Sequence, residues 1–229
     1  MITHQQESRL FEFCQKHFVH HYDVQLELED HLANAIDEQM KNDPSLSFEK
    51  ALENVYESFG AAGFAPLVSE KRKSVERQGR QLFWKLFKEH FRWPKILLFL
   101  IIISLGFTMF SIDSDLYRIF YISVSVACLL AELYGIVKTR KEISSTGKKF
   151  LIAEFSQNVP LILLFFYCFI FPDAFETDFP PTSHAYFSIL FLNILIGIVV
   201  LITIVNWQVL SSLTSDLRND YPEVFAAIN

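Results

Sequence analysis

The chain has few cysteines and none of the short motifs by which many enzymes are recognised. Its three cysteines, Cys14, Cys128 and Cys168, lie far apart without a CxxC pair, which argues against a disulfide framework and a zinc site. We expect them to be reduced packing residues. No glycine-rich phosphate loop, nucleophile elbow or nucleotide fingerprint occurs. The sequence therefore predicts no catalytic residue, no cofactor and no enzymatic activity.

Positive charge is scarce in the first part of the chain. Up to Glu70 there are four Lys and Arg residues against thirteen Asp and Glu residues, an acidic balance that repels nucleic acid. We therefore expect no nucleic-acid partner. The balance reverses in residues 71–95, which hold nine bases and two acids. A basic segment of this kind is typical of the residues next to a membrane span.

Segments with strand alternation are missing, whereas long apolar runs are abundant. Hydrophobic residues make up 51% of the chain, too many and too unevenly spread for one water-soluble domain. A helix of roughly 17 to 25 residues crosses a bilayer core of about 30 Å. Four runs are long enough, at residues 96–112, 119–137, 150–171 and 185–205. Buried core helices are the alternative, but four such runs leave too little polar surface to solvate that core.

Lys and Arg are unevenly divided among the loops between these runs. Loop 138–149 holds five of them, whereas loop 113–118 holds one and loop 172–184 holds none. The cytoplasmic loops of membrane proteins are the ones rich in Lys and Arg. We therefore expect a multi-pass protein of a bacterial inner membrane, with the N-terminus and the tail 206–229 both in the cytoplasm.

The basic segment also carries an apolar face. Within RQLFWKLFKEHFRW, residues 80–93, the apolar side chains recur at helical spacing and the bases fall elsewhere. This pattern predicts an amphipathic juxtamembrane helix over 71–95 that rests on membrane lipids. The residues expected at the lipid surface are Trp84, Lys85, Lys88, Arg92 and Trp93. The alternative is a last helix of the preceding domain, and one helix could serve both purposes.

Residues 1–70 have the pattern of a small acidic helical domain. One helix is expected within residues 5–20, followed by a second whose N-terminus Asp23 can cap. A third begins after Ser47, which can cap it, and a fourth follows. The predicted fold class is all-α, a cytoplasmic helical bundle followed by four transmembrane helices in residues 96–205.

Part of this domain has a recognisable pattern, the run DVQLELEDHLANAIDEQM followed by SFEKALENVYESFG and GF. It resembles the small helical signalling or prefix domain that precedes transmembrane segments in many bacterial membrane proteins, some of them encoded beside PadR-type regulators. The matching positions are Glu27, Leu28, Asp30, His31, Leu32, Ala51, Phe59, Gly60 and Phe64. The match covers about a third of the chain and excludes the four apolar runs. It implies an accessory or signalling role and carries over no catalytic residue.

Acidic residues lie mostly off the apolar stripe of the second expected helix. Those expected to bind a protein partner are Glu27, Asp30, Asp37 and Glu38, together with His31. An ordinary solvated surface has the same composition, so that alternative stays open.

Histidines near this face invite a metal hypothesis. His17, His20 and His21 are close in sequence, and imidazole is a common zinc ligand. No HExxH pattern occurs, and the three histidines straddle an expected helix end. We therefore expect no metal, and we interpret His31 as pairing with Glu27 one helical turn away.

Two carboxylates, Glu132 and Glu154, lie inside the apolar runs near their cytoplasmic ends, with Asn158 close to the second. Charge within a bilayer is costly and often functional, so a small transporter or channel component is the alternative function. Interhelical hydrogen bonding is the simpler interpretation. The preferred prediction is a non-enzymatic regulatory or accessory membrane protein, which could form a homo-oligomer.

Overall fold

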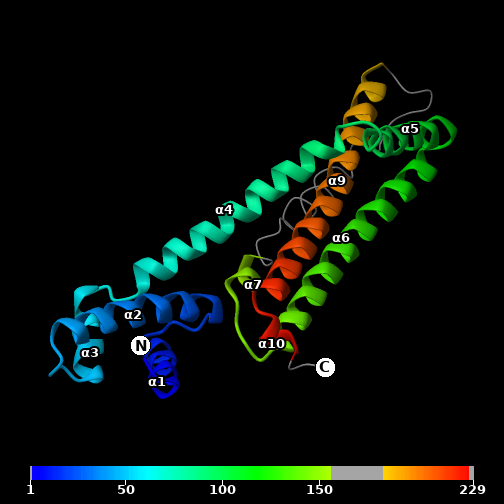
Figure 1. The fold of residues 1–229 in the computed structure, drawn as a ribbon. Helices are drawn as coiled ribbons and strands as arrows, with labels where there is room; N and C mark the ends of the chain where they lie inside the picture. Colours follow the sequence, from blue (N-terminus) through cyan, green and yellow to red (C-terminus); the bar gives the residue numbers. More distant parts are fainter. Residues whose placement is uncertain (1, 156–182, 227–229) are drawn as a thin grey trace. The chain divides into compact units, whose positions relative to one another are not determined.

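A computed structural model describes residues 2–155 and 183–226, which form helices and no strands (Figure 1). The all-α prediction is thereby confirmed for these two ranges. The chain divides into two compact units that do not follow its linear order. Counting described residues, the first unit comprises 2–78, 142–155 and 223–226, and the second comprises 79–141 and 183–222.

Three helices and the beginning of a fourth make up most of the first unit. They are α1 (His4–Lys16), α2 (Tyr22–Asn42), α3 (Phe48–Ser58) and α4 (Ala65–His90). Thr3 caps α1 in a capping box with Gln6, and Ser47 caps α3 by accepting a hydrogen bond from the amide of Lys50. Gly60 follows α3 with φ at 71°, a left-handed conformation that favours glycine and ends the helix.

The core of the first unit is apolar and nearly closed to solvent. Its buried members are Leu10, Cys14, Val19, Val24, Leu28, Leu32, Ile36, Ala51, Leu52, Val55, Phe64 and Leu151. Burial raises the pKa of the Cys14 thiol to about 12, so this cysteine stays protonated and serves as a packing residue. Leu151 is the member that comes from far along the chain, at the start of the third apolar run.

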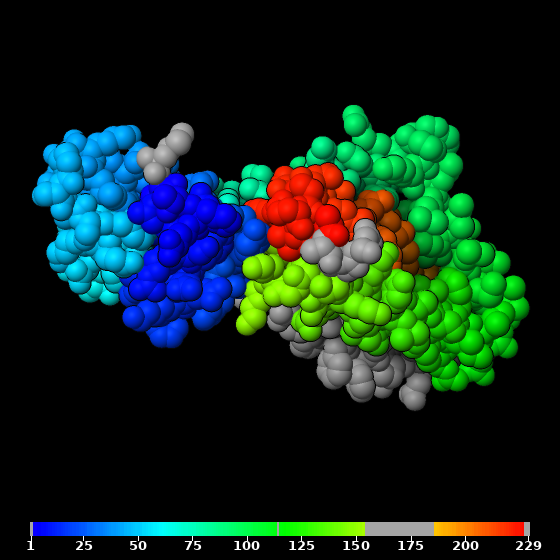
Figure 2. Space-filling view, turned by 60° about the horizontal axis from the view of Figure 1, so that its bottom comes forward, coloured from blue at the N-terminus to red at the C-terminus, as the bar shows by residue number. Residues whose placement is uncertain are grey.

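Two short helices bring distant segments into the first unit, α7 (Leu151–Phe155) and α10 (Pro222–Ala226). The Phe150 and Phe225 rings stack with centroids 6.3 Å apart, and the two segments lie side by side in the space-filling view (Figure 2). The first unit is therefore built from three separate stretches of the chain.

Asp23 does not have the role expected from the sequence. The residue at the N-cap of α2 is His21, and Asp23 lies in the first turn with only 6% of its surface exposed. Its Oδ1 accepts a hydrogen bond from the amide of Leu151 at 3.4 Å. The carboxylate therefore faces a segment that comes from far along the chain, in a contact between residues 128 positions apart.

The second unit contains the end of α4 and three apolar helices, α5 (Ile96–Ile112), α6 (Ser114–Ser144) and α9 (Ser183–Asp220). α5 and α9 pack closely. A Cβ on Gly106 would lie 2.0 Å from Oδ1 of Asn193, and one on Gly197 would lie 2.6 Å from the Phe99 ring. Glycine at both positions lets the backbones approach. The order of these two contacts along the helices makes α5 and α9 antiparallel.

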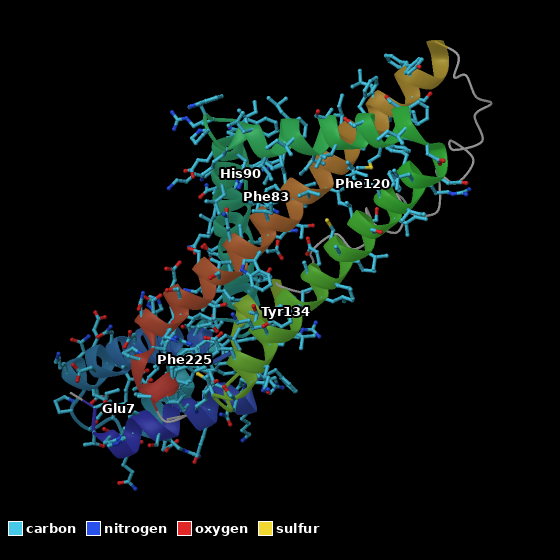
Figure 3. All side chains as sticks on the ribbon, turned by 90° about the vertical axis from the view of Figure 1, so that its right-hand side faces the viewer. Glu7, Phe83, His90, Phe120, Tyr134 and Phe225 are labelled. Carbon is cyan, nitrogen blue, oxygen red and sulfur yellow. The ribbon has the colours of Figure 1, made fainter. Side chains whose placement is uncertain are left out.

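α6 and α9 run side by side in the same direction (Figure 3). Near the beginning of both helices, the Tyr117 hydroxyl donates to Oδ1 of Asn193 at 3.2 Å. Further along both, Nδ2 of Asn206 donates to Oε1 of Glu132 at 3.0 Å. The residue numbers of the paired side chains increase together in α6 and in α9, so the two helices are parallel.

Two helices in the described part of the chain have the length and apolar composition to cross a membrane. They are Asp115–Ser144 within α6 and Tyr186–Asp220 within α9, and an 18-residue stretch of each has a mean hydropathy of 1.9 and 2.9, respectively. α5 is apolar but has 17 residues. Its bounds equal the first run expected from the sequence, whereas α6 and α9 continue past the second and fourth runs. Most of the third run, 150–171, lies outside the described residues.

Candidate functional site

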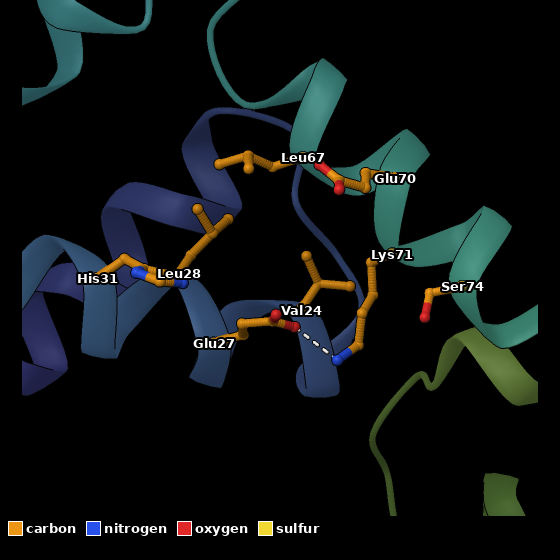
Figure 4. A pocket seen from close by; sticks show the side chains of 8 residues that line it. All are labelled: Val24, Glu27, Leu28, His31, Leu67, Glu70, Lys71 and Ser74. Atoms are coloured by element: carbon orange, nitrogen blue, oxygen red, sulfur yellow. Dashed lines mark ion pairs between the residues drawn. The ribbon is translucent and has the colours of Figure 1, made fainter.

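A hollow of about 190 Å³ lies between α2 and the first turns of α4 (Figure 4). It has an apolar floor and a polar rim. The floor is formed by Val24, Leu28 and Leu67, and the rim by Glu27, His31, Glu70, Lys71 and Ser74. Two of the residues expected to bind a partner, Glu27 and His31, therefore line a real concavity. We call it the α2–α4 hollow.

The rim of the hollow holds an ion pair. Nζ of Lys71 lies 2.6 Å from Oε2 of Glu27, and their side chains are 34% and 48% exposed. Lys71, rather than His31, is thus the ion-pair partner of Glu27. An exposed pair of this kind contributes about 0 to 1 kcal/mol to stability, so another cation can replace it at little cost.

The remaining acids of the α2 face differ in their surroundings. Nζ of Lys41 lies 2.7 Å from Oδ2 of Asp37, and this hydrogen bond lowers the pKa of the carboxyl to about 2. Asp30 and Glu38 are exposed. The face is therefore less negative than its sequence suggests, because two of its four acids already pair with lysines of the same chain.

The histidines do not assemble a metal site. The His17 ring packs against Phe13 and Tyr56, with centroids 4.3 and 4.1 Å away, and burial lowers the pKa of the imidazole. His21 is the N-cap residue of α2. Within the ranges that the structure describes, no group of three or more His, Cys, Asp or Glu side chains could hold a metal ion.

Of the polar residues expected inside the apolar runs, Glu132 has a defined partner. Glu132 and Asn206 are 6% and 8% exposed, and their hydrogen bond joins α6 to α9. The side chain of Glu154 and the whole of Asn158 lie outside the described residues. The contact that is described links two helices, as interhelical hydrogen bonds in membranes do.

The residues expected at the lipid surface lie at the end of α4 and just after it. Trp84 and Trp93 are 55% and 77% exposed, and Lys85, Lys88 and Arg92 are exposed as well. A row of stacked or tilted rings runs along the apolar side of this segment, from Phe83 through Phe87 and Phe91 to Phe99 of α5. The apolar side chains therefore form a face that continues onto the apolar helix α5.

Comparison of the chain with protein-family models, with curated proteins and with solved structures found no match. The resemblance noted for the second and third helices therefore stays a prediction.

Sequence reasoning missed the other half of the hollow. Leu67, Glu70 and Lys71 complete it, yet only the general basic character of the segment after Glu70 was visible in the sequence. An ion pair between residues of two separate helices has no local signature. The spacing of Lys71 from Leu67, one helical turn, was the one available signal that both face the same neighbour.

Proposed function

We propose that the chain is a multi-pass protein of the bacterial inner membrane with a non-enzymatic regulatory or accessory role, whose helical unit binds a protein partner through α2. One observation carries the proposal, the α2–α4 hollow with its polar rim, formed in part by the helix that also carries the exposed Asp30 and Glu38. An apolar floor with charged edges suits a partner side chain that has an aliphatic stem and a cationic end.

A parity argument supports a multi-pass arrangement. α6 and α9 are parallel. Two successive spans with the same direction require an odd number of crossings between them. The sequence between them contains one apolar run, residues 150–171, of which residues 156–171 follow the stretch that packs in the first unit. With α5, which is antiparallel to α9, the arrangement corresponds to four crossings.

The first unit contains three separate segments of the chain, which supports their location on the same side of the membrane. Residues 142–155 and 223–226 pack with residues 2–78. Segments that pack into one unit outside the bilayer share one side of it. The five bases of loop 138–149 favour the cytoplasm as that side, with both termini located there. Exposed aromatic and basic residues at the end of α4 suit contact with anionic lipid there.

The partner interface is tested by crosslinked affinity purification from native membranes with a chain carrying Asp30→Lys and Glu38→Lys. We expect loss of a specific cytosolic partner, because both side chains are exposed and their reversal repels a cationic surface. Glu57→Lys, a charge reversal at an exposed position of α3, is the control. Capture unchanged by the double reversal would contradict the proposal. Deleting residues 1–70 is a poorer test, because it would uncover the buried Leu151.

A small transporter or channel component is the second candidate, favoured by the burial of the Glu132 carboxylate among apolar helices. It would use Glu132 and Glu154. Glu132→Gln keeps the hydrogen-bond acceptor for Asn206 but removes the charge. Loss of ion or proton flux in proteoliposomes with unchanged assembly would support this candidate.

A further inference from the structure

The beginning of α2 is held by a set of contacts that we call the clasp, formed by Tyr22 and Asp23 with residues 148–151 and Phe225. The amide of Tyr22 donates to the carbonyl oxygen of Lys149 at 2.7 Å. In return, the amide of Leu151 donates to the Asp23 carboxylate at 3.4 Å. The two hydrogen bonds run in opposite directions between the same two stretches of chain.

Apolar and aromatic side chains close the clasp. Phe150 is 0% exposed and Leu151 is 2% exposed. The Phe150 ring meets the Tyr22 ring edge-on, with centroids 5.8 Å apart, and stacks on Phe225 of α10. Nζ of Lys148 lies 4.9 Å from the centroid of the Tyr22 ring, in a cation–π contact. Burial of these side chains favours the closed arrangement.

Asp23 opposes the same closure. The residue is 6% exposed, and the hydrogen bond that it accepts from Leu151 is long. Burial raises the pKa of Asp23, although the Leu151 amide and the nearby charges of His21 and Lys71 act in the other direction. Opening the clasp would return the carboxylate to water while exposing Phe150 and Leu151. Burial of the carboxylate and burial of the two apolar side chains therefore act in opposite directions on the closure.

From this geometry we infer that the clasp is a conformational device, which couples the start of the third apolar run and the C-terminal segment to α2. Asp23 is one helical turn before Glu27, and the adjacent Val24 lines the α2–α4 hollow. Movement of residues 148–151 therefore acts on the helix that carries the acidic face. This consequence for partner binding rests on the proposed function, whereas the opening of the clasp does not.

Hydrogen exchange of the full chain in lipid nanodiscs, read at the Tyr22 and Leu151 amides, tests the inference. Asp23→Asn keeps an acceptor oxygen but removes the buried charge, so it should stabilise the closed clasp and slow exchange of both amides. Phe150→Ala should open it and speed exchange. Asp30→Asn makes the same charge change at an exposed site of the same helix and should leave both amides unchanged.

Equal or faster exchange in Asp23→Asn than in the native chain would overturn the inference, and so would equal slowing by Asp30→Asn. Amides of α3 report whether Phe150→Ala still folds, and the Asp23→Asn result stands without that variant. The measurement needs no partner. Failure of the clasp is therefore distinguishable from failure of the proposed interface, which the reversal of Asp30 and Glu38 tests.

Discussion

At the scale of single residues, Asp23 gives the first unit a pH dependence. Its pKa is raised above the ordinary 3.8, chiefly by burial, while Leu151, His21 and Lys71 oppose the shift. A carboxyl with a raised folded-state pKa stabilises the fold most below pH 3.8, and this contribution is lost as pH rises through the folded-state value. Asp23→Asn should therefore be more stable than the native chain at pH 7, with a difference that shrinks toward pH 3.8.

Thermal unfolding of both chains between pH 4 and pH 7 measures this difference. Asp30→Asn is the control, because Asp30 is exposed and removal of its charge relieves no desolvation cost. A stability difference between Asp23→Asn and the native chain that stayed constant over the range would show that charge burial is not its cause.

Phe18 is a second residue at which a single change should stabilise the fold. It follows α1 with φ at 66°, in the left-handed region, and its side chain is 85% exposed. Glycine adopts that conformation without the clash of a Cβ atom. Phe18→Gly should raise the free energy of unfolding by about 0.5 to 1 kcal/mol, measured by denaturant titration. A lower free energy of unfolding in Phe18→Gly would mean that contacts of the Phe18 ring stabilise the fold by more than the backbone strain destabilises it.

At the scale of elements, the packing of α5 on α9 depends on a missing side chain. A Cβ on Gly106 would collide with the Asn193 amide, which is 1% exposed and accepts the hydrogen bond of Tyr117. Gly106→Ala should therefore separate the helices and lower stability by about 1 to 3 kcal/mol, measured by thermal unfolding in detergent. Ser104→Ala changes an exposed position of α5 and should have little effect. Equal melting of both variants would contradict this account of the contact.

The elements also show what the sequence could and could not predict. The cap at Ser47 and the stop at Gly60 are local features, and the structure contains both. Hydropathy located the apolar parts of α6 and α9 but underestimated the length of both helices. The helical hydrogen bonding of the backbone continues into polar residues, which a search for apolar runs excludes. The pairing of Asp23 with Leu151 was not predictable, since two residues 128 positions apart leave no periodic signal.

At the scale of the whole molecule, the direction of the helices predicts which loops share a side of the membrane. Because α6 and α9 are parallel and a third apolar run lies between them, their C-terminal ends should emerge on the same side. The turn between α5 and α6 should lie on the opposite side. Cysteines introduced at Ser145, Asn219 and Asp113, all exposed positions, mark these three places.

Labelling of sealed vesicles with a membrane-impermeant maleimide gives the readout for that topology. Cys14 and Cys128 are buried, and Cys168 is replaced by serine to remove background. Ser145→Cys and Asn219→Cys should be labelled from one side and Asp113→Cys only from the other, because an impermeant reagent cannot reach a cysteine across the bilayer. If Ser145→Cys and Asn219→Cys were labelled from opposite sides, the third apolar run would not cross the membrane. If all three cysteines were labelled from one side, α6 would not span the membrane.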